Sequence, residues 1–147
     1  MAQDSSLPAE FAGLPKAEFA FPGPLRDQLV GAILDGRKTT TTGLLIEYEI
    51  EGSVVPEAGD RCVVVDSRDQ PVAVIELTEV RVAPLGTVDL VHAVDEGEGH
   101  HTVEEWRRAH EDFWHGPDVR AELGSDFSVD DETPVVMERF RLIRRLA

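Results

Sequence analysis

Apolar residues along the chain recur first at helical and then at strand spacing. Between Pro24 and Gly36 they recur three and four positions apart. Proline suits the first turn of a helix and glycine suits the position after its end, so this segment predicts a short amphipathic helix. Residues 46–50 alternate apolar and acidic side chains instead, which predicts a strand with one buried face.

The rest of the chain is richer in strand signals. Residues 61–67 and 71–82 carry many β-branched side chains and are joined by a short polar link, so they predict a hairpin, and residues 135–145 predict a last strand. A helix is expected from Val103 to about Trp114, because Thr102 and Glu105 have the spacing of a capping box. Helices set between antiparallel strands favour an α+β fold, a small β-barrel with two or three flanking helices.

The remaining segments show no sustained period. Residues 1–18 predict an irregular N-terminal arm ahead of one domain at 19–147, and residues 84–101 and 116–133 are looser and polar. A chain of 147 residues is long enough to bury a single core. The start lacks the features of a signal peptide, and no apolar run is long enough to span a membrane. We therefore expect a soluble, cytoplasmic protein without membrane contacts.

Charge narrows the range of partners. The chain has 29 acidic and 14 basic side chains, a formal net charge of -15. Proteins that bind nucleic acids through phosphates need a basic surface, so tight binding of a long RNA is disfavoured, while small ligands and single nucleotides stay open. Cys62 is the only cysteine, which excludes an intramolecular disulfide and a cysteine-rich zinc site.

The segment from Gly36 to Gly43 reads Gly-Arg-Lys-Thr-Thr-Thr-Thr-Gly. It is not a P-loop, because the required glycine spacing is missing and a strand follows it. Lys38 can supply a point charge or, if desolvated, a base, and a neighbouring threonine hydroxyl can act as a nucleophile. The alternative is structural: threonines favour strands, and cations are stabilised at the C-terminal end of a helix.

A second candidate is the acidic stretch Asp-Glu-Gly-Glu-Gly at residues 95–99. A carboxylate held near a lysine can fix its charge or transfer a proton, although solvated acidic loops are common. Five histidines lie nearby in sequence, but their spacing matches no metal motif, so neither a metal nor another cofactor is expected. His110 is interpreted as a hydrogen-bonded core residue. Arg139 and Arg141 share a strand face and can either line an anion-binding groove or pair with neighbouring acids.

These features together resemble the ASCH domain family of the PUA-like β-barrel superfamily. The resemblance rests on Gly-x-Lys-x-x-Thr at Gly36, Lys38 and Thr41, a β-rich middle, and Glu-Gly-Glu-Gly followed by the helix WRRAHEDFW. It covers about residues 19–146. Small bacterial members of the family include amidohydrolases that deacetylate N4-acetylcytidine, and others are described as ribonucleases.

The resemblance implies catalytic roles for Lys38, Thr41 and Glu96, whose side chains should converge in one pocket. Lys38 would activate Thr41 for attack on an acyl carbonyl, while Glu96 would orient Lys38 or protonate the leaving amine. Alternatively, Glu96 would activate water directly and Thr41 would only hydrogen-bond the substrate. Backbone amides near Gly43 or Gly97 would hold the oxyanion. Substrate-binding roles are expected for seven residues: Arg37, Thr42, Gly43, Gly97, Glu98, Arg139 and Arg141.

Gly43 stands where many family members carry arginine, in a Thr-Thr-Gly subgroup, and the lost guanidinium disfavours phosphate binding. The leading hypothesis is therefore a hydrolase of an acylated nucleobase or nucleoside. The alternatives are a non-catalytic module that binds RNA or a nucleotide and, third, a metal-independent ribonuclease. The oligomeric state is left open.

Overall fold

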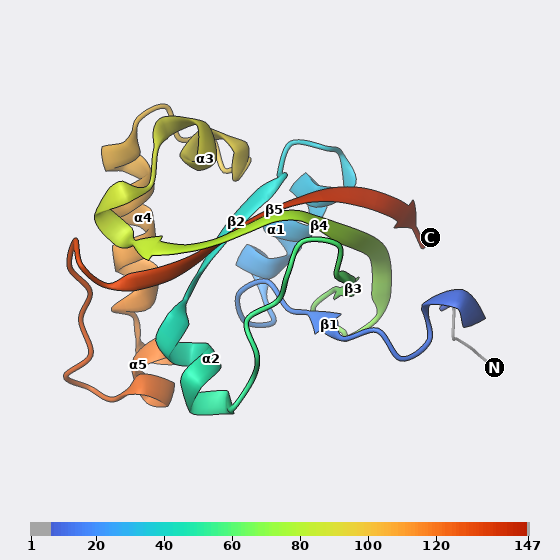
Figure 1. Cartoon of the computed structure of the whole chain (residues 1–147), viewed down its shortest axis with the longest axis horizontal. Helices are drawn as coiled ribbons and strands as arrows, with labels where there is room; N and C mark the ends of the chain where they lie inside the picture. Colours follow the sequence, from blue (N-terminus) through green and yellow to red (C-terminus); the bar gives the residue numbers. More distant parts are fainter. Residues whose placement is uncertain (1–6, 147) are drawn as a thin grey trace.

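Two long antiparallel strands run through the whole molecule and support the other elements (Figure 1). They are β4 (Pro71–Pro84) and β5 (Pro134–Arg145). The computed structural model describes residues 7–146, which form one mixed sheet in the order β1-β3-β4-β5-β2. The shorter strands are β1 (Lys16–Ala17), β2 (Thr40–Leu44) and β3 (Arg61–Val65). β1 runs parallel to β3, and the other neighbours are antiparallel.

Helices cover the sheet and confirm the α+β class. The α-helices are α1 (Pro24–Leu34), α2 (Leu45–Glu51), α3 (Leu90–Asp95), α4 (Val103–Trp114) and α5 (Pro117–Leu123). The expected helices α1 and α4, the hairpin β3–β4 and the last strand β5 are all present. The sheet is open in the described part of the chain, with β1 and β2 as its edges, and does not close into a barrel.

The strand predicted at residues 46–50 is wrong, because this segment lies in α2. Ile46 and Ile50 are four positions apart, a spacing that suits one face of a helix as well as alternate positions of a strand. Gly52 then ends the helix in the left-handed conformation at φ 70°. The two segments without a period also contain short helices, α3 and α5.

The N-terminal arm is more regular than expected. Within residues 7–18, β1 extends the sheet, and Phe11 packs at 2% exposure against β3 and β4. Residues 1–6 of the predicted arm, and Ala147 at the end of the predicted domain, lie outside the described residues.

Two apolar clusters divide the fold into halves. Around α1, residues of β3, β4 and β5 pack against Leu29 and Ile33. Around α3, α4 and α5, Trp106 and Trp114 pack against β2 and β5. The segment that links α1 to β2 runs between these halves and positions the site described below. Within residues 7–146, no helix combines the length and apolar character needed to cross a membrane.

Candidate functional site

The link between α1 and β2 turns a lysine into the interior. Gly36 adopts φ +87°, and the Lys38 amide then donates to the Ala32 carbonyl at 3.1 Å. The Lys38 side chain is 2% exposed, and its ammonium donates to the Thr40 carbonyl at 2.8 Å and to the Glu96 carbonyl at 3.4 Å. Burying an ammonium is costly without a counter-charge, so this position requires a nearby carboxylate.

The acidic loop after α3 supplies that carboxylate by docking on the same link. The Thr39 amide donates to the Asp95 carbonyl at 2.8 Å. Gly97 has φ +75°, and a Cβ on it would lie 2.6 Å from the Arg37 carbonyl oxygen. Real Cβ atoms do not approach backbone so closely, so a glycine is required here for packing as well as for its φ.

Glu96 is the centre of the site, and four side chains surround its carboxylate. One oxygen, Oε1, lies 3.1 Å from His110 Nε2 and 3.6 Å from the Lys38 ammonium. The other, Oε2, accepts from the Thr42 hydroxyl at 2.6 Å and lies 3.6 Å from His92 Nε2. The side chain is 1% exposed. Four hydrogen-bond donors and cations thus surround one buried charge.

The hydrogen bonds determine where the protons sit. His110 Nδ1 lies 2.9 Å from the Trp106 carbonyl, which can only accept, and its Nε2 faces Glu96, so both nitrogens carry hydrogen. Thr42 donates to Glu96, so at 2.7 Å its oxygen accepts from His92 Nε2. His110 also stacks on Trp106, with ring centroids 4.1 Å apart. The cluster therefore has a fixed donor and acceptor order.

The groups of this cluster differ in how their surroundings shift their pKa values. Burial alone would raise the pKa of Glu96, but Lys38 and His110 outweigh it and hold the pKa well below its usual range. Burial opposes the charge of His110, but the hydrogen bond that it donates to Glu96 raises its pKa. Burial raises the pKa of Glu98, and the Glu96 charge adds to this against the attraction of Lys38. Glu96 is therefore the firmly ionised carboxylate of the cluster, and its charge favours the protonated form of His110.

Of the three residues predicted to converge, Lys38, Thr41 and Glu96, two lie together in the structure. Lys38 and Glu96 meet as expected, but the hydroxyl that reaches Glu96 belongs to Thr42. Thr40 and Thr42 both point toward α3, where Thr40 donates to the His92 carbonyl at 2.9 Å. Side chains alternate along a strand, so Thr41 points to the opposite face of β2. The catalytic role that the resemblance assigns to Thr41 stays a prediction.

The expected substrate-binding residues are scattered. Arg37 is exposed and pairs with Asp35 at 2.9 Å, away from Glu96. Arg139 pairs with Asp95 at 3.0 Å, at the outer side of the acidic loop. Arg141 pairs with Glu76 on β4 at 2.6 Å. Arg139 and Arg141 thus pair with acids, as the structural alternative holds, and a shared anion groove finds no support in them.

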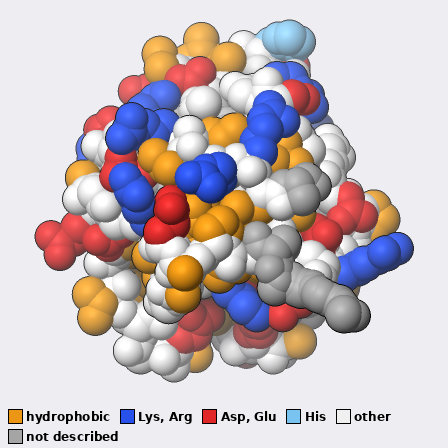
Figure 2. All heavy atoms as spheres, turned by 90° about the vertical axis from the view of Figure 1, so that its right-hand side faces the viewer, with side chains coloured by type: hydrophobic (Ala, Val, Ile, Leu, Met, Phe, Trp, Pro, Cys, Tyr) orange, Lys and Arg blue, Asp and Glu red, His pale blue; other side chains and the backbone are white. Residues whose placement is uncertain are grey.

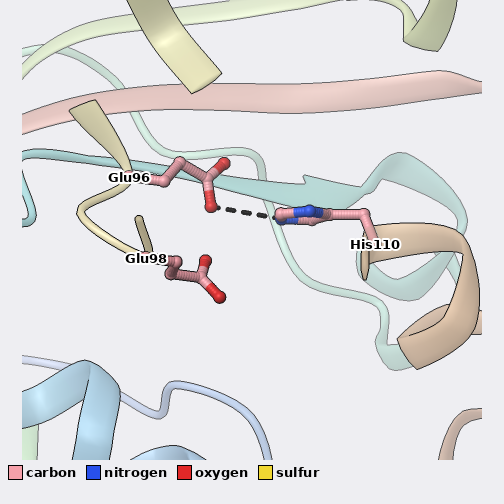
Figure 3. Close-up of side chains that lie close together, drawn as sticks. All are labelled: Glu96, Glu98 and His110. Atoms are coloured by element: carbon pink, nitrogen blue, oxygen red, sulfur yellow. Dashed lines mark hydrogen bonds and ion pairs between the residues drawn. The ribbon is translucent and has the colours of Figure 1, made fainter. Parts of the chain in front are cut away.

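Two further predictions concern backbone groups and acids near the cleft. The Gly97 amide already donates to the Val94 carbonyl at 3.1 Å, so it is not free to hold an oxyanion. Gly43 lies within β2, opposite Val136 of β5. Glu98 does lie at the site, with its carboxylate near Glu96 and His110 (Figure 3).

Sequence reasoning missed the two histidines that complete the site. His110 was interpreted as a core histidine, and its partner Glu96 lies 14 positions away. His92 lies four positions before Glu96, which brings both to one side of the α3 turn. That spacing was the available signal. Phe19 was given no role at the site, yet its ring centroid lies 5.8 Å from the Lys38 ammonium.

Glu96, Glu98 and His110 each offer a ligand atom, and these atoms lie within 4.8 Å of one another (Figure 3). The Lys38 ammonium lies 3.6 Å from Glu96 Oε1, so a divalent ion placed among the three ligand atoms would lie next to it. Two cations that close in a buried site repel each other strongly. The donor set therefore fits a lysine and histidine ion pair better than a metal.

The surroundings of the site are mixed in charge. An open pocket of about 410 Å³ shares His92 with the site and is lined by Glu79, Arg81, Asp89, Val91, His92, Met137, Glu138 and Arg139. Figure 2 shows another face, where basic side chains are interleaved with acidic and apolar ones. Neither surface forms the long basic groove that a polymer of phosphates requires.

Comparisons with known proteins agree with this architecture. The model of the ASCH domain family matches residues 18–144. A crystal structure of an ASCH domain from Lactobacillus crispatus is 25% identical, with a TM-score of 0.76 over 93% of this chain and 86% of that one. A protein from Enterococcus faecalis is 24% identical, with a TM-score of 0.78 over 90% and 78%. No curated protein matches the sequence.

Proposed function

The chain belongs to the ASCH domain family and has its PUA-like fold, and from that premise we propose that it is a hydrolase of an acylated nucleobase or nucleoside. The bond cleaved would be an amide of the N4-acetylcytidine type. One observation carries the proposal: the buried Lys38–Glu96 ion pair receives the hydroxyl of Thr42, at 2.6 Å from Glu96. An ionised carboxylate that accepts from a hydroxyl is the arrangement an activated nucleophile needs.

The order of donors supports a division of roles. Glu96 accepts the hydrogen of Thr42 and so directs a lone pair of the hydroxyl oxygen away from itself, toward an acyl carbon or a bound water. His92 donates to the same oxygen and fixes its orientation. Thr42 then acts as the nucleophile or as the group that positions a nucleophilic water.

Lys38 and protonated His110 supply positive charge where an oxyanion develops. Both lie on Glu96 Oε1, at 3.6 Å and 3.1 Å, and both are shielded from water. Fixed charges in a site of low dielectric stabilise a transition state more than the same charges in water. The hydrogens of both groups are already engaged, as is the Gly97 amide first expected in this role, so Lys38 and His110 act through their charge.

The size of the charged cluster supports a small substrate. The net charge of the chain is -15, and the positive charge at the site comes from Lys38 and His110 rather than from an extended basic surface. A nucleoside with one acyl group fits such a site better than a long RNA does. This substrate, and the expected cytoplasmic location, are parts of the proposal.

The proposal is tested by incubating the protein with N4-acetylcytidine and longer N4-acylcytidines and measuring the release of cytidine and acid. Thr42→Val should lower turnover by about 100-fold or more, because it removes the hydroxyl without changing the shape of the side chain. Thr42→Ser should restore activity in part. Thr41→Val is the matched control, one position along β2, and should keep turnover within about threefold of the wild type.

Each outcome separates one part of the proposal. A wild-type protein that releases no cytidine from any member of the series overturns the hydrolase. Loss of activity in Thr41→Val with an active Thr42→Val protein overturns the assignment of the hydroxyl to Thr42 and supports the residue that the resemblance implies.

A further inference from the structure

Two glutamates of the acidic loop point into the same space but differ in their partners (Figure 3). Glu96 accepts hydrogen bonds from β2 and α4 and lies 3.6 Å from the ring nitrogen of His92 on α3. In the described part of the chain, no group donates a hydrogen bond or forms an ion pair to the carboxylate of Glu98. Yet Glu98 is half-buried, within 4.8 Å of the nearest ligand atoms of Glu96 and His110.

A carboxylate in this position is poorly placed to stay ionised. It faces the ionised Glu96, and two negative charges this close in a partly buried site cannot both be retained without further donors. The Thr42 hydroxyl and His110 Nε2 are already directed at Glu96. A proton on Glu98 removes the repulsion and gives the group a hydrogen to donate. Burial and the charge of Glu96 both raise the pKa of Glu98.

The charged groups that face Glu98 come from every element packed around it. Lys38 lies on the link before β2, Glu96 on the same loop, and His110 on α4. His100 lies close to Glu96 and His110, and burial lowers its pKa. The attraction of Lys38 and His110 opposes the proton on Glu98, but both cations contact Glu96 directly. The two carboxyl groups are therefore split into an ionised member and a protonated member.

We propose that Glu98 is the catalytic acid of this site and donates a proton to the amine that leaves when the acyl amide is cleaved. The inference rests on the hydrolase function proposed above. Glu98 is the more accessible of the two carboxyl groups, and it lies beside His110 and beside Glu96, the carboxylate that accepts from Thr42.

The step balances within the pair. The oxygen nucleophile bonds to the acyl carbon and releases its proton to Glu96. The carbon–nitrogen bond then breaks, its electron pair stays on nitrogen, and the proton of Glu98 forms the new N–H bond. Glu98 is left as a carboxylate, and the proton held by Glu96 restores its acid form. When water is the nucleophile, the acyl group leaves as the acid. When Thr42 is the nucleophile, the acyl group stays on its oxygen as an ester; a water molecule then attacks that ester, one of its protons restores the Thr42 hydroxyl through Glu96, and the acid is released. In both cases the pair ends with the protonation with which it began.

The test compares two acetyl donors that differ in their leaving group. Cytidine leaves N4-acetylcytidine as an amine that needs a proton, whereas nitrophenolate leaves p-nitrophenyl acetate without one. Glu98→Gln should lower turnover of N4-acetylcytidine by about 100-fold or more and change ester turnover by less than about fivefold. Glu104→Gln, on the exposed first turn of α4, is the control and should match the wild type on both donors.

Glutamine has the shape of the protonated acid, so the variant should fold, and unfolding in urea checks this. Equal losses on amide and ester, or no loss on the amide, overturn the acid role of Glu98. A wild-type protein that cleaves neither donor overturns the hydrolase and the acid role together. Carboxyl ¹³C NMR of the free protein gives an independent result: a pKa of Glu98 below that of Glu96 overturns the acid role alone.

Discussion

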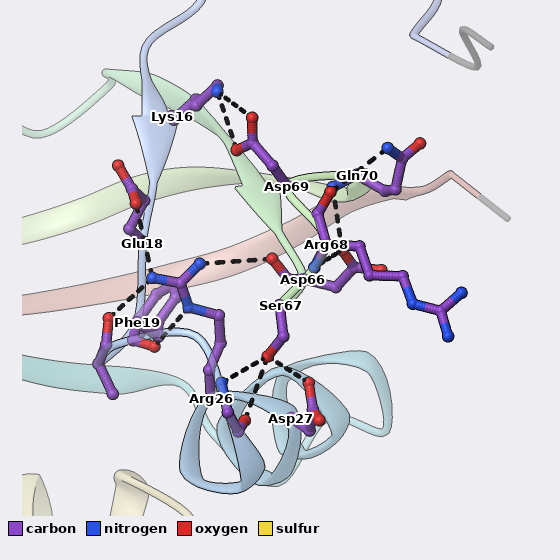
Figure 4. A network of polar contacts seen from close by, with 12 residues as sticks. Lys16, Glu18, Phe19, Arg26, Asp27, Asp66, Ser67, Arg68, Asp69 and Gln70 are labelled. Atoms are coloured by element: carbon purple, nitrogen blue, oxygen red, sulfur yellow. Dashed lines mark hydrogen bonds and ion pairs between the residues drawn. The ribbon is translucent and has the colours of Figure 1, made fainter. Parts of the chain in front are cut away.

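Two cations are buried to the same degree in this molecule, and they are held in opposite ways. Arg26 is 3% exposed and Lys38 is 2% exposed. Arg26 donates to backbone carbonyls of Phe19, Ala20 and Asp66, at 3.1, 2.8 and 3.3 Å (Figure 4). Lys38 lies against a carboxylate that also binds a hydroxyl and two histidines.

The difference separates a structural clamp from a chemical site. The carbonyls around Arg26 cannot titrate, and its carboxylate neighbour Glu18 is 3.5 Å away and 59% exposed. Arg26 ties the segment before α1 to the turn after β3, and this contact holds Ala20 at φ 60°, a strained value for a residue other than glycine. Around Lys38, by contrast, the neighbours can exchange protons. Burial of a cation alone therefore does not mark a functional site, whereas its counter-groups do.

The largest expected effect comes from removing the cation with a buried counter-charge. Lys38→Met leaves Glu96 ionised without its lysine, and loss of one partner of a buried pair costs about 3–5 kcal/mol of unfolding free energy. Urea unfolding at neutral pH measures it. Lys16→Met is the control, since the exposed Lys16–Asp69 pair is worth less than about 1 kcal/mol.

A double variant checks the cause. The double variant Lys38→Met/Glu96→Gln removes both charges. Its loss of unfolding free energy should be smaller than the sum of the losses in the two single variants. Strict additivity would contradict the coupling of Lys38 and Glu96 and would leave Lys38 as a packing residue.

Arg26→Met should cost somewhat less, about 3 kcal/mol, because it leaves three carbonyl oxygens without their donor, two of which can relax toward water. The loss should be the same from pH 5 to 8, since no titratable group of the clamp is buried. Glu18→Gln should change it little, as Glu18 is exposed. A loss that varies with pH, measured by urea unfolding, would contradict the contrast between the two cations.

Local signals predicted the parts of the fold that local chemistry decides. Pro24 and Gly36 bounded α1, and at α4 the Glu105 amide donates to the Thr102 hydroxyl at 3.0 Å, as a capping box requires. Glu105 itself accepts from the His101 amide rather than from Thr102. The segment with Ile46 was assigned the wrong element because apolar positions four apart satisfy both periods.

The site needed information that no local pattern holds. The family resemblance predicted that Lys38 and Glu96 lie together. Which threonine meets Glu96 depends on which face of β2 each side chain occupies, and a register shift of one residue exchanges the two faces. Thr42 lies 54 positions from Glu96, and His110 reaches it from another helix. Such long-range register is set by packing between α3, α4 and β2, which the sequence does not display.

The next effect tests how closely the acidic loop must approach Lys38. Gly97→Ala places a Cβ 2.6 Å from the Arg37 carbonyl oxygen, at φ +75°. Gly99 has a similar φ of +86°, but a Cβ added there would have no atom within 4 Å. The difference between the two variants therefore isolates the contact. Gly97→Ala should lose about 2 kcal/mol more than Gly99→Ala in urea unfolding. Equal losses would mean that the loop can move away from Lys38 at little cost.

The smallest expected effect is a change in how stability depends on pH. The pKa of Glu98 is raised in the folded protein, so between its ordinary value of 4.5 and the folded value only the folded state binds this proton. Glu98 therefore lowers stability as pH rises through that window, and the deficit persists above it. Glu98→Gln cannot ionise, so it should equal the wild type near pH 4 and exceed it at pH 8 by less than about 1 kcal/mol. Thermal unfolding across this range, with Glu104→Gln as control, measures the difference. A variant less stable than the wild type at pH 8 would mean that the carboxylate of Glu98 is held by Lys38 and His110, so that both glutamates, and not Glu96 alone, belong to the ionised cluster.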